Sequence, residues 1–255
     1  MNNTDHTPTG TTKDQDIKPK EAPSREKVWQ MFDRISGRYD LLNRILSMRR
    51  DVAWRKRLAR NLPEINDQRV LDLATGTGDV LLSIIKYSNR VKYGIGIDMA
   101  REMLVRGREK FSNINSGVSA RLFPADAMSL PFKDKQFHTV SIAFGIRNVL
   151  DVKEALAEMY RVLDNPGRVL ILEFSIPANF LIRKIYLFYF RYILPGVGSL
   201  ISGDAYAYRY LNKTVETFPY GEAFCRLMQE VGFQDVRAIP LTFGIATFYR
   251  GDRLK

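Results

Sequence analysis

The stretch Val70-Leu-Asp-Leu-Ala-Thr-Gly-Thr-Gly78 decides the fold class, because an apolar run leads directly into a glycine-rich turn. The apolar run is typical of a buried strand, and from Val80 onward the apolar residues recur with helical spacing. Gly76 and Gly78 leave the backbone without a Cβ where a ligand can approach, and the start of a helix presents unpaired N–H groups. The stretch therefore predicts a strand, a ligand-binding turn and a helix.

Further strands and helices alternate along the chain after this stretch. Strands are expected at 70–74, 93–98, 121–126, 138–145 and 168–175, with helices at 80–87, 101–111 and 152–162. This alternation predicts a doubly wound parallel sheet. Two last strands, 233–241 and 245–250, are joined by too few residues for a parallel crossover and predict an antiparallel hairpin. The expected α/β sheet, mostly parallel with seven strands, resembles the Rossmann-like fold of class I S-adenosylmethionine-dependent methyltransferases.

Length and composition favour one domain with a loose N-terminal tail. The chain has 255 residues, 45% of them hydrophobic and 11% aromatic, which is ample for a core. Residues 1–23 carry almost no large apolar side chain and are expected to be disordered. The domain is expected over 24–255, with a helical cap at 24–62. An insertion at 176–218 is expected to cover a substrate, as in this class of fold.

Cysteine usage and charge limit the function classes. Cys225 is the only cysteine, which excludes an internal disulfide and any Cys-x-x-Cys metal or redox pair. No secretory signal and no apolar stretch of about 20 residues is visible, so a cytoplasmic protein without a metal is expected. The net charge of +11 would attract an anionic partner, either nucleic acid or a phospholipid surface. A basic run at 49–60 is interpreted as a solvated helix face.

An acidic residue at the end of the second strand supports a nucleoside-binding site. Asp98 follows Gly78 by twenty residues, where a carboxylate grips ribose hydroxyls in dinucleotide folds. The dinucleotide fingerprint fails because Leu81 occupies its third glycine position. Asp72 inside the first strand would repel a diphosphate and attract a sulfonium. The pattern therefore favours S-adenosylmethionine over a dinucleotide.

Four further residues complete the expected donor site. Asp126 and Ala127 end the third strand and are expected to border an adenine, although Asp126 also suits a helix-capping role. Thr77 in the glycine turn and Met99 beside Asp98 are expected to line the same site.

Three separated motifs carry a family resemblance. They are Tyr39-Asp-Leu-Leu-Asn-Arg-Ile-Leu-Ser47 followed by Trp54, then Phe144-Gly-Ile-Arg-Asn148, and Arg161-Val-Leu163 continuing to Gly167 and Leu172-Glu-Phe-Ser175. Together, from about residue 28 to 250, they resemble the ubiquinone and menaquinone biosynthesis C-methyltransferases. The chain departs from that pattern at Asp51 in place of His, at Asp164-Asn165-Pro166 in place of a Lys-Pro-Gly-like turn, and at Ala143 in place of Ser.

The resemblance implies methyl transfer to a ring carbon of a prenylated quinol, demethylmenaquinol or its demethylubiquinol equivalent. Such a carbon becomes nucleophilic when a neighbouring phenol loses its proton, so a base or relay is needed. His6 lies in the tail, and His138 begins a strand about 20 Å from the reactive end, so neither histidine is a candidate. Arg147 and Asn148, at the productive end of that strand, are expected to orient the quinol oxygen.

The N-terminal helix and the insertion are expected to complete the substrate site. Tyr39 and Asn43 are assigned catalytic roles, although helix capping and partial burial are equally compatible with them. Asp40, Asp204 and Tyr208 are assigned to substrate binding.

Two alternatives stay open. The charge permits an enzyme that methylates RNA or another small aromatic substrate, but an Asn-Pro-Pro-Tyr type tetrapeptide and an RNA-binding module are both missing. Residues 178–201 combine aromatic, Lys and Arg side chains, which suits either a lid helix or peripheral contact with the inner face of an anionic membrane. The sequence also leaves a homo-oligomer open.

Overall fold

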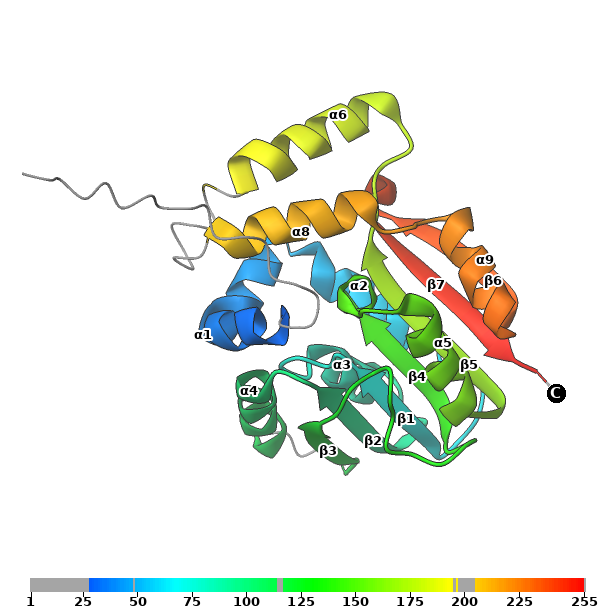
Figure 1. Ribbon diagram of the computed structural model, residues 1–255. Helices are drawn as coiled ribbons and strands as arrows, with labels where there is room; N and C mark the ends of the chain where they lie inside the picture. Colours follow the sequence, from blue (N-terminus) through cyan, green and yellow to red (C-terminus); the bar gives the residue numbers. More distant parts are fainter. Residues whose placement is uncertain (1–27, 48, 114–116, 195, 197–204, 255) are drawn as a thin grey trace, which may run out of the picture.

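The computed structural model describes residues 28–47, 49–113, 117–194, 196 and 205–254. Its seven-stranded sheet has the order β3-β2-β1-β4-β5-β7-β6, and only β7 runs antiparallel to its neighbours. This is the predicted class I methyltransferase sheet with its C-terminal hairpin (Figure 1). The tail expected at 1–23 lies outside the described residues.

The strands and helices follow the predicted alternation. The strands are β1 (Gln68–Leu73), β2 (Val91–Asp98), β3 (Ser119–Pro124), β4 (Phe137–Ala143), β5 (Leu163–Phe174), β6 (Gln234–Leu241) and β7 (Ala246–Arg253). The helices around the parallel strands are α3 (Asp79–Tyr87), α4 (Arg101–Ser112) and α5 (Val152–Val162), and α9 (Glu222–Val231) precedes the hairpin. Short helical turns are η2 (Ile146–Asn148) and η4 (Thr242–Gly244), the second joining β6 to β7.

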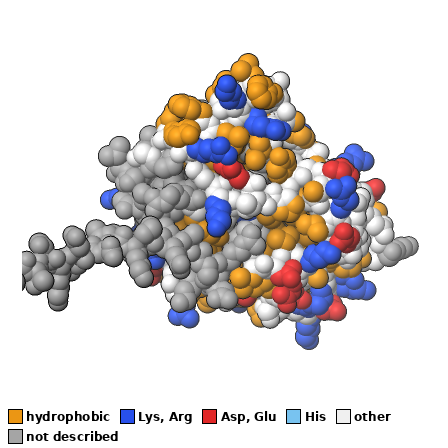
Figure 2. Space-filling view, turned by 45° about the horizontal axis from the view of Figure 1, so that its top comes forward, with side chains coloured by type: hydrophobic (Ala, Val, Ile, Leu, Met, Phe, Trp, Pro, Cys, Tyr) orange, Lys and Arg blue, Asp and Glu red, His pale blue; other side chains and the backbone are white. Residues whose placement is uncertain are grey.

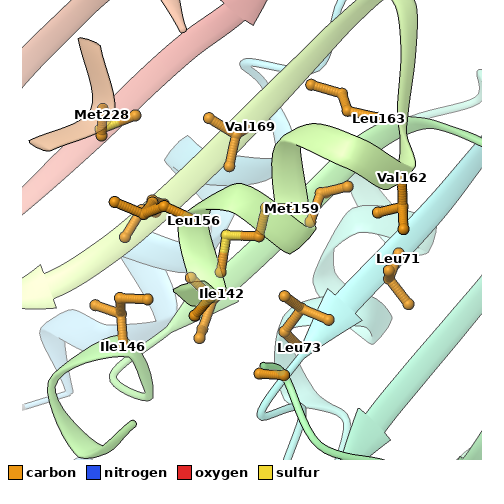
Figure 3. Close-up of a cluster of buried hydrophobic side chains, with 14 of the residues drawn as sticks. Leu71, Leu73, Ile142, Ile146, Leu156, Met159, Val162, Leu163, Val169 and Met228 are labelled. Carbon is orange, nitrogen blue, oxygen red and sulfur yellow. The ribbon is translucent and has the colours of Figure 1, made fainter. Parts of the chain in front are cut away.

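Both faces of the sheet are buried, as the strand sequences require. In β5, Val169 and Ile171 point to a cluster with α5 and α9, whereas Leu170 and Leu172 point to the opposite cluster with α2 and α3. Figure 3 shows the first cluster, in which Leu156 and Met159 of α5 lie over the strands. Side chains alternate across a strand, so two apolar faces need helices on both sides.

The turn expected before the fifth strand lies inside β5 instead. Phe137 of β4 pairs with Leu163, but Thr139 pairs with Arg168, so residues 164–167 form an irregularity in the ladder. Proline lacks an N–H donor, and Pro166 sits within this irregular part. The strand resumes regular pairing at Arg168 and continues to the edge that carries the functional residues.

The helical cap consists of α1 (Val28–Leu46) and α2 (Arg50–Ala59). Helix α1 lies beside α4, and α2 packs against α3 (Figure 1). The interpretation of the basic run as wholly solvated was wrong for Arg55, which is buried and pairs with Asp51 and Asp79. A buried cation needs such partners. The other basic side chains of the run are exposed or half-buried.

The expected cover over the substrate site is helical where it is described. It comprises α6 (Phe180–Phe188), the π-helix η3 (Tyr189–Ile193) and α8 (Ala205–Thr217). Helix α6 lies outermost, at the top of Figure 1, with α8 beneath it. Tyr186, Phe190 and Val215 join these helices to the core cluster on the α2 side of the sheet.

A substitution at Gly96 of β2 would test how tightly the side chains pack under the glycine turn. A Cβ at this position would lie 2.5 Å from Leu122 Cδ2 and 2.8 Å from Thr75 Oγ1, inside van der Waals contact. We expect Gly96→Ala to lower the free energy of unfolding by about 1–3 kcal/mol, measured by urea unfolding. Gly196→Ala is the control, because no atom lies within 4 Å of that Cβ. Equal unfolding free energies for the two variants would contradict this packing.

Candidate functional site

A cavity lies at the carboxyl ends of the parallel strands, between the sheet and α1. Loops after four strands and one helix supply its walls: Ala74 and Gly76; Asp98 and Met99; Ala125, Asp126, Ala127 and Met128; Phe144, Gly145 and Asn148; and Trp29, Phe32 and Tyr39 of α1. Parallel strands bring their carboxyl ends to one edge, which explains why residues far apart in sequence meet here. The lining is mainly apolar, with few polar groups.

Asp98 fixes the glycine turn from the side of β2. Its Oδ2 accepts a hydrogen bond from the Gly76 N–H at 2.8 Å, and its Oδ1 accepts one from the Ala100 N–H at 2.8 Å. Burial raises the pKa of Asp98 to about 6, although these N–H groups oppose the rise. The carboxylate also borders the cavity, so it can accept hydrogen bonds from a ligand's hydroxyl groups.

The conformation of the turn leaves room for a ligand. Gly76 has a φ of 55°, and the nearest atom to a Cβ built there is Tyr39 Cε1 at 3.8 Å. Gly78 has a φ of 80°, and a Cβ there would lie 2.5 Å from the Phe111 ring. Positive φ values are cheap only for glycine. A side chain at Gly76 would therefore enter the space between the turn and α1.

Asp72 lies beneath the turn, apart from the cavity lining where the sequence placed it. It is fully buried, and it accepts hydrogen bonds from Thr75 Oγ1 at 2.6 Å and Ser141 Oγ at 2.7 Å. Burial raises its pKa to about 7. Asp72 therefore shapes the turn, and the turn shapes the cavity.

The loop after β3 supplies the next part of the wall. Asp126 lines the cavity and also caps its own loop, because its Oδ1 accepts a hydrogen bond from the Met128 N–H at 2.9 Å. Both sequence interpretations of Asp126 are thus compatible with its position. Ala127 is buried beside it, and Met99 lies across the cavity with its side chain 45% exposed.

Tyr39 of α1 covers the cavity from above the glycine turn. Phe32 holds its ring edge-on at 5.8 Å between centroids, and the Asn43 side chain hydrogen-bonds its hydroxyl. Burial raises the pKa of Tyr39, while the nearby Arg147 charge lowers it. Tyr39 is therefore a neutral hydrogen-bonding group at the mouth of the site, and Asn43 orients it from outside the lining.

Asp40 belongs to an ionic network that fastens α1 to the turn, and it is not part of the cavity lining. Its Oδ1 accepts a hydrogen bond from Thr77 Oγ1 at 2.7 Å, and Lys110 Nζ lies 2.5 Å from its Oδ2. Lys110 also reaches Asp79 at 2.7 Å, and Asp79 pairs with Arg55 of α2 at 3.1 Å. The sequence assigned Asp40 to substrate binding, whereas in the structure its side chain contacts Thr77 and Lys110. Thr77 likewise faces this network.

Arg147 is held in the interior beside the cavity by a residue that the sequence did not single out. Its Nη1 donates to Glu173 Oε1 at 2.6 Å and to the Phe144 carbonyl at 2.5 Å. Arg147 is 5% exposed and Glu173 is 1% exposed, and burial raises the pKa of Glu173 while Arg147 lowers it. An acidic residue in the otherwise apolar 169–174 segment was the available signal for Glu173.

Polar atoms without partners surround this ion pair. Among the described residues, Arg147 Nε, Asn148 Oδ1 and the Tyr186 hydroxyl are buried and have no hydrogen-bond partner. Asn148 lines the cavity, and the Arg147 guanidinium lies 5.5 Å from the centre of the Phe174 ring. Each unpartnered buried group costs about 1–3 kcal/mol. The arrangement therefore leaves polar groups that a ligand or water could satisfy.

Two assignments to substrate binding fall where the structure does not describe the side chain. Asp204 is outside the described residues, and Tyr208 falls in α8 where its side chain is not described. His138 lies at the opposite end of β4 from the cavity, where its Nδ1 accepts a hydrogen bond from the Arg69 N–H at 3.1 Å. That contact agrees with the structural role expected for His138.

The raised pKa values of Asp72 and Asp98 predict a pH effect on stability. The folded state holds their protons more tightly than the unfolded state does, so it binds more protons between about pH 4 and pH 7. Their contribution to the free energy of unfolding therefore decreases as pH rises through this interval. We expect Asp72→Asn to show a flatter dependence than the parent in urea unfolding between about pH 5 and about pH 8. Asp235→Asn, at an exposed site, is the control, and an unchanged slope in Asp72→Asn would refute the assignment.

Known proteins with similar sequences share nearly the full length of this chain. Residues 20–253 match the model of the ubiE/COQ5 methyltransferase family. The chain is 43% identical over 230 residues to the ubiquinone/menaquinone biosynthesis C-methyltransferase UbiE of Geotalea uraniireducens, covering 89% of this chain and 97% of that protein. It is 45% identical over 223 residues to the demethylmenaquinone methyltransferase of Thermus thermophilus, covering 88% and 100%.

Solved structures agree at the level of the fold. A SAM-dependent methyltransferase from Thermotoga maritima superposes with a TM-score of 0.60 at 21% identity, covering 88% of this chain and 98% of that chain. Another from Methanococcus maripaludis gives 0.61 at 15% identity, covering 93% and 98%. The match to a methyltransferase family over residues 20–253 makes S-adenosylmethionine the co-substrate. With its sheet order, its cavity at the strand ends and this full-length similarity, the chain belongs to the ubiE/COQ5 methyltransferase family.

Proposed function

We propose that this enzyme transfers a methyl group from S-adenosylmethionine to a ring carbon of a prenylated quinol, demethylmenaquinol or its demethylubiquinol equivalent. The observation that carries the proposal is the buried Arg147–Glu173 pair, with unpartnered polar atoms beside a cavity suited to a nucleoside. Relatives of similar length carry the names of quinone-biosynthesis methyltransferases. The fixed cation and the cavity together meet two needs of the reaction, donor binding and stabilisation of a phenolate.

The donor site follows from the groups around the glycine turn. Asp98 would accept hydrogen bonds from ribose hydroxyls, and Gly76 would let the backbone approach the ligand closely. Asp126 and Ala127 would border the adenine, with Met99 on the other side. When bound, S-adenosylmethionine supplies an electrophilic methyl group on a positively charged sulfur. The carboxylates near the turn favour that charge.

On the acceptor side, Arg147 stabilises negative charge, and the phenolic proton passes to a water that Asn148 orients. The Arg147 guanidinium stays protonated in proteins, so it cannot itself accept the phenolic proton. Glu173 fixes the guanidinium from behind, which leaves Nε as a donor toward a ligand oxygen. Asn148 Oδ1 is an acceptor in the same region and can orient a water or a phenolic O–H. Tyr39 would close the site over the bound pair.

Tyr186 of α6 is a further group for the quinol. Its ring stacks on Phe190 at 5.1 Å between centroids, and its hydroxyl is the unpartnered one. Burial raises the pKa of Tyr186, while the Arg147 charge opposes the rise, so the two groups share one electrostatic environment. A quinol has two oxygens on opposite sides of its ring. We assign one oxygen to Arg147 and Asn148, and the other to the Tyr186 hydroxyl.

The surroundings of the enzyme follow from its substrate. Among the described residues, no helix is long and apolar enough to cross a membrane. A prenylated quinol dissolves in lipid, so the enzyme would collect it at the inner face of the cell membrane while staying peripheral. An RNA substrate is less well supported, because the relatives of similar length are named for quinone biosynthesis. Arg55 of the basic helix is also engaged in internal ion pairs.

The direct test is methyl transfer from labelled S-adenosylmethionine to short-chain prenylated quinols, with RNA as the competing acceptor. We expect transfer to the quinol, and we expect Arg147→Ala to lower kcat by about 100- to 1,000-fold because the phenolate loses its fixed cation. The dissociation constant for S-adenosylmethionine, measured by calorimetry, should stay nearly unchanged. Transfer to RNA alone, or full turnover in Arg147→Ala, would overturn the proposal.

The assignment of Tyr186 has its own test. Tyr186→Phe removes one oxygen and keeps the ring stack, so we expect kcat/KM for the quinol to fall about tenfold. Because an unpartnered buried hydroxyl is removed, the free energy of unfolding should stay equal or rise. Tyr192→Phe, 70% exposed one turn and a half further along, is the matched control and should behave as the parent. An unchanged kcat/KM in Tyr186→Phe would show that its hydroxyl does not meet the substrate.

A further inference from the structure

The segment formed by α6 and η3 has one buried face and one exposed apolar face. Tyr186, Phe190 and Leu194, spaced by four residues, pack into the core cluster. The outer face carries large apolar side chains that contact water: Phe180 at 78% exposure, Leu181 at 64%, Ile185 at 62%, Phe188 at 58%, Tyr192 at 70% and Ile193 at 43%. Soluble monomers seldom expose so many large apolar side chains together, and such patches mark interaction sites.

The outer face is also basic. Residues 180–193 contain no Asp or Glu, and Arg183 and Lys184 are exposed among the apolar side chains. Arg191 is engaged with Glu216 of α8 at 2.6 Å, which ties η3 to the body of the protein. Figure 2 shows Lys and Arg side chains interspersed with hydrophobic ones in the upper part of the molecule, where α6 lies. The charge of this face has the same sign as the net charge of +11.

The charge and the composition of this face indicate what binds to it. A second copy of the chain docking by the same face would bring two positively charged faces together, which is a repulsive arrangement. An anionic lipid surface is complementary to both properties, since aromatic rings and basic side chains favour the headgroup region and aliphatic ones the acyl boundary. We propose that the outer face of α6 and η3 docks the enzyme on an anionic phospholipid bilayer.

The location of this face explains how a lipid-soluble substrate reaches the site, and this step rests on the proposed function. Tyr186 and Phe190, on the inner face of the same segment, join the cluster that contains Phe174, whose ring lies beside Arg147. One helix diameter, about 10 Å, therefore separates the lipid from that cluster. A prenyl tail can stay in the bilayer while the quinol ring occupies the site.

The test is co-sedimentation of the full chain with vesicles, without substrate or methyl donor. Vesicles of phosphatidylcholine and phosphatidylglycerol in equal parts are compared with vesicles of phosphatidylcholine alone. We expect binding to the anionic vesicles, and about a 30-fold loss of affinity in the double variant Arg183→Glu/Lys184→Glu, from about 1 kcal/mol per basic residue at the surface. Phe180→Ser/Phe188→Ser should also lose at least about tenfold.

A matched control separates this face from general charge. Arg57→Glu/Arg60→Glu makes the same change in net charge at the C-terminal end of α2, where both side chains are exposed, and should reduce vesicle affinity far less. Equal loss in both charge variants, or equal binding to neutral and anionic vesicles, would overturn the proposal. So would a dimer in analytical ultracentrifugation that Phe180→Ser/Phe188→Ser converts to a monomer without loss of vesicle binding.

Failure of the docking surface and failure of the proposed function give different results. Turnover of a water-soluble short-tail quinol should be the same in the parent and in Arg183→Glu/Lys184→Glu, because neither residue contacts the site. If the parent binds anionic vesicles but methylates no quinol, the proposed function fails and the docking surface stands. If it methylates the soluble quinol but ignores vesicles, only the docking surface fails.

Discussion

The turn between β1 and α3 depends on two carboxylates, the buried Asp72 and the half-buried Asp98, and the rest of the site depends on that turn. Asp72 holds it from below through Thr75, and Asp98 holds it from the side through the Gly76 N–H. Backbone polar groups that leave the regular ladder must find partners, and burial makes each such partner decisive. Loss of solvent around these two carboxyl groups raises the pKa of both. Hydrogen bonds within the protein itself thereby hold this part of the cavity wall.

A second buried charge organises the acceptor half of the site in a different way. Glu173 balances the charge of Arg147, yet Arg147 Nε has no hydrogen-bond partner. Asn148 Oδ1 nearby also has none. A buried ion pair costs desolvation energy, so its value here is best understood as positioning. The donor half is complete within itself, whereas the acceptor half contains polar atoms that only a ligand or water can satisfy. This difference is why we place the aromatic substrate there.

The helical additions to the sheet divide the remaining tasks. Asp40 of α1 contacts Thr77 of the turn and Lys110 of α4. These contacts hold α1 over the donor cavity. The α6 and η3 segment instead turns one face toward the core and leaves the other apolar and basic. Helix α1 is held by ion pairs, which suits a position in water. The α6 and η3 segment has an exposed apolar face, which suits a position beside lipid.

The sequence alone determined the sheet, the glycine turn and part of the cavity wall. These features rest on local periodicity and on the rule that parallel strands end at one edge, so Gly76, Asp98, Met99, Asp126, Ala127 and Asn148 could be placed together from their spacing. Only the tertiary structure decided the partners of the charged residues. It placed Asp72 beneath the turn, Asp40 against Lys110, Arg55 inside, and Glu173 behind Arg147. Charge pairing joins residues from different elements, and no periodicity in one strand or helix encodes which distant side chain will meet it.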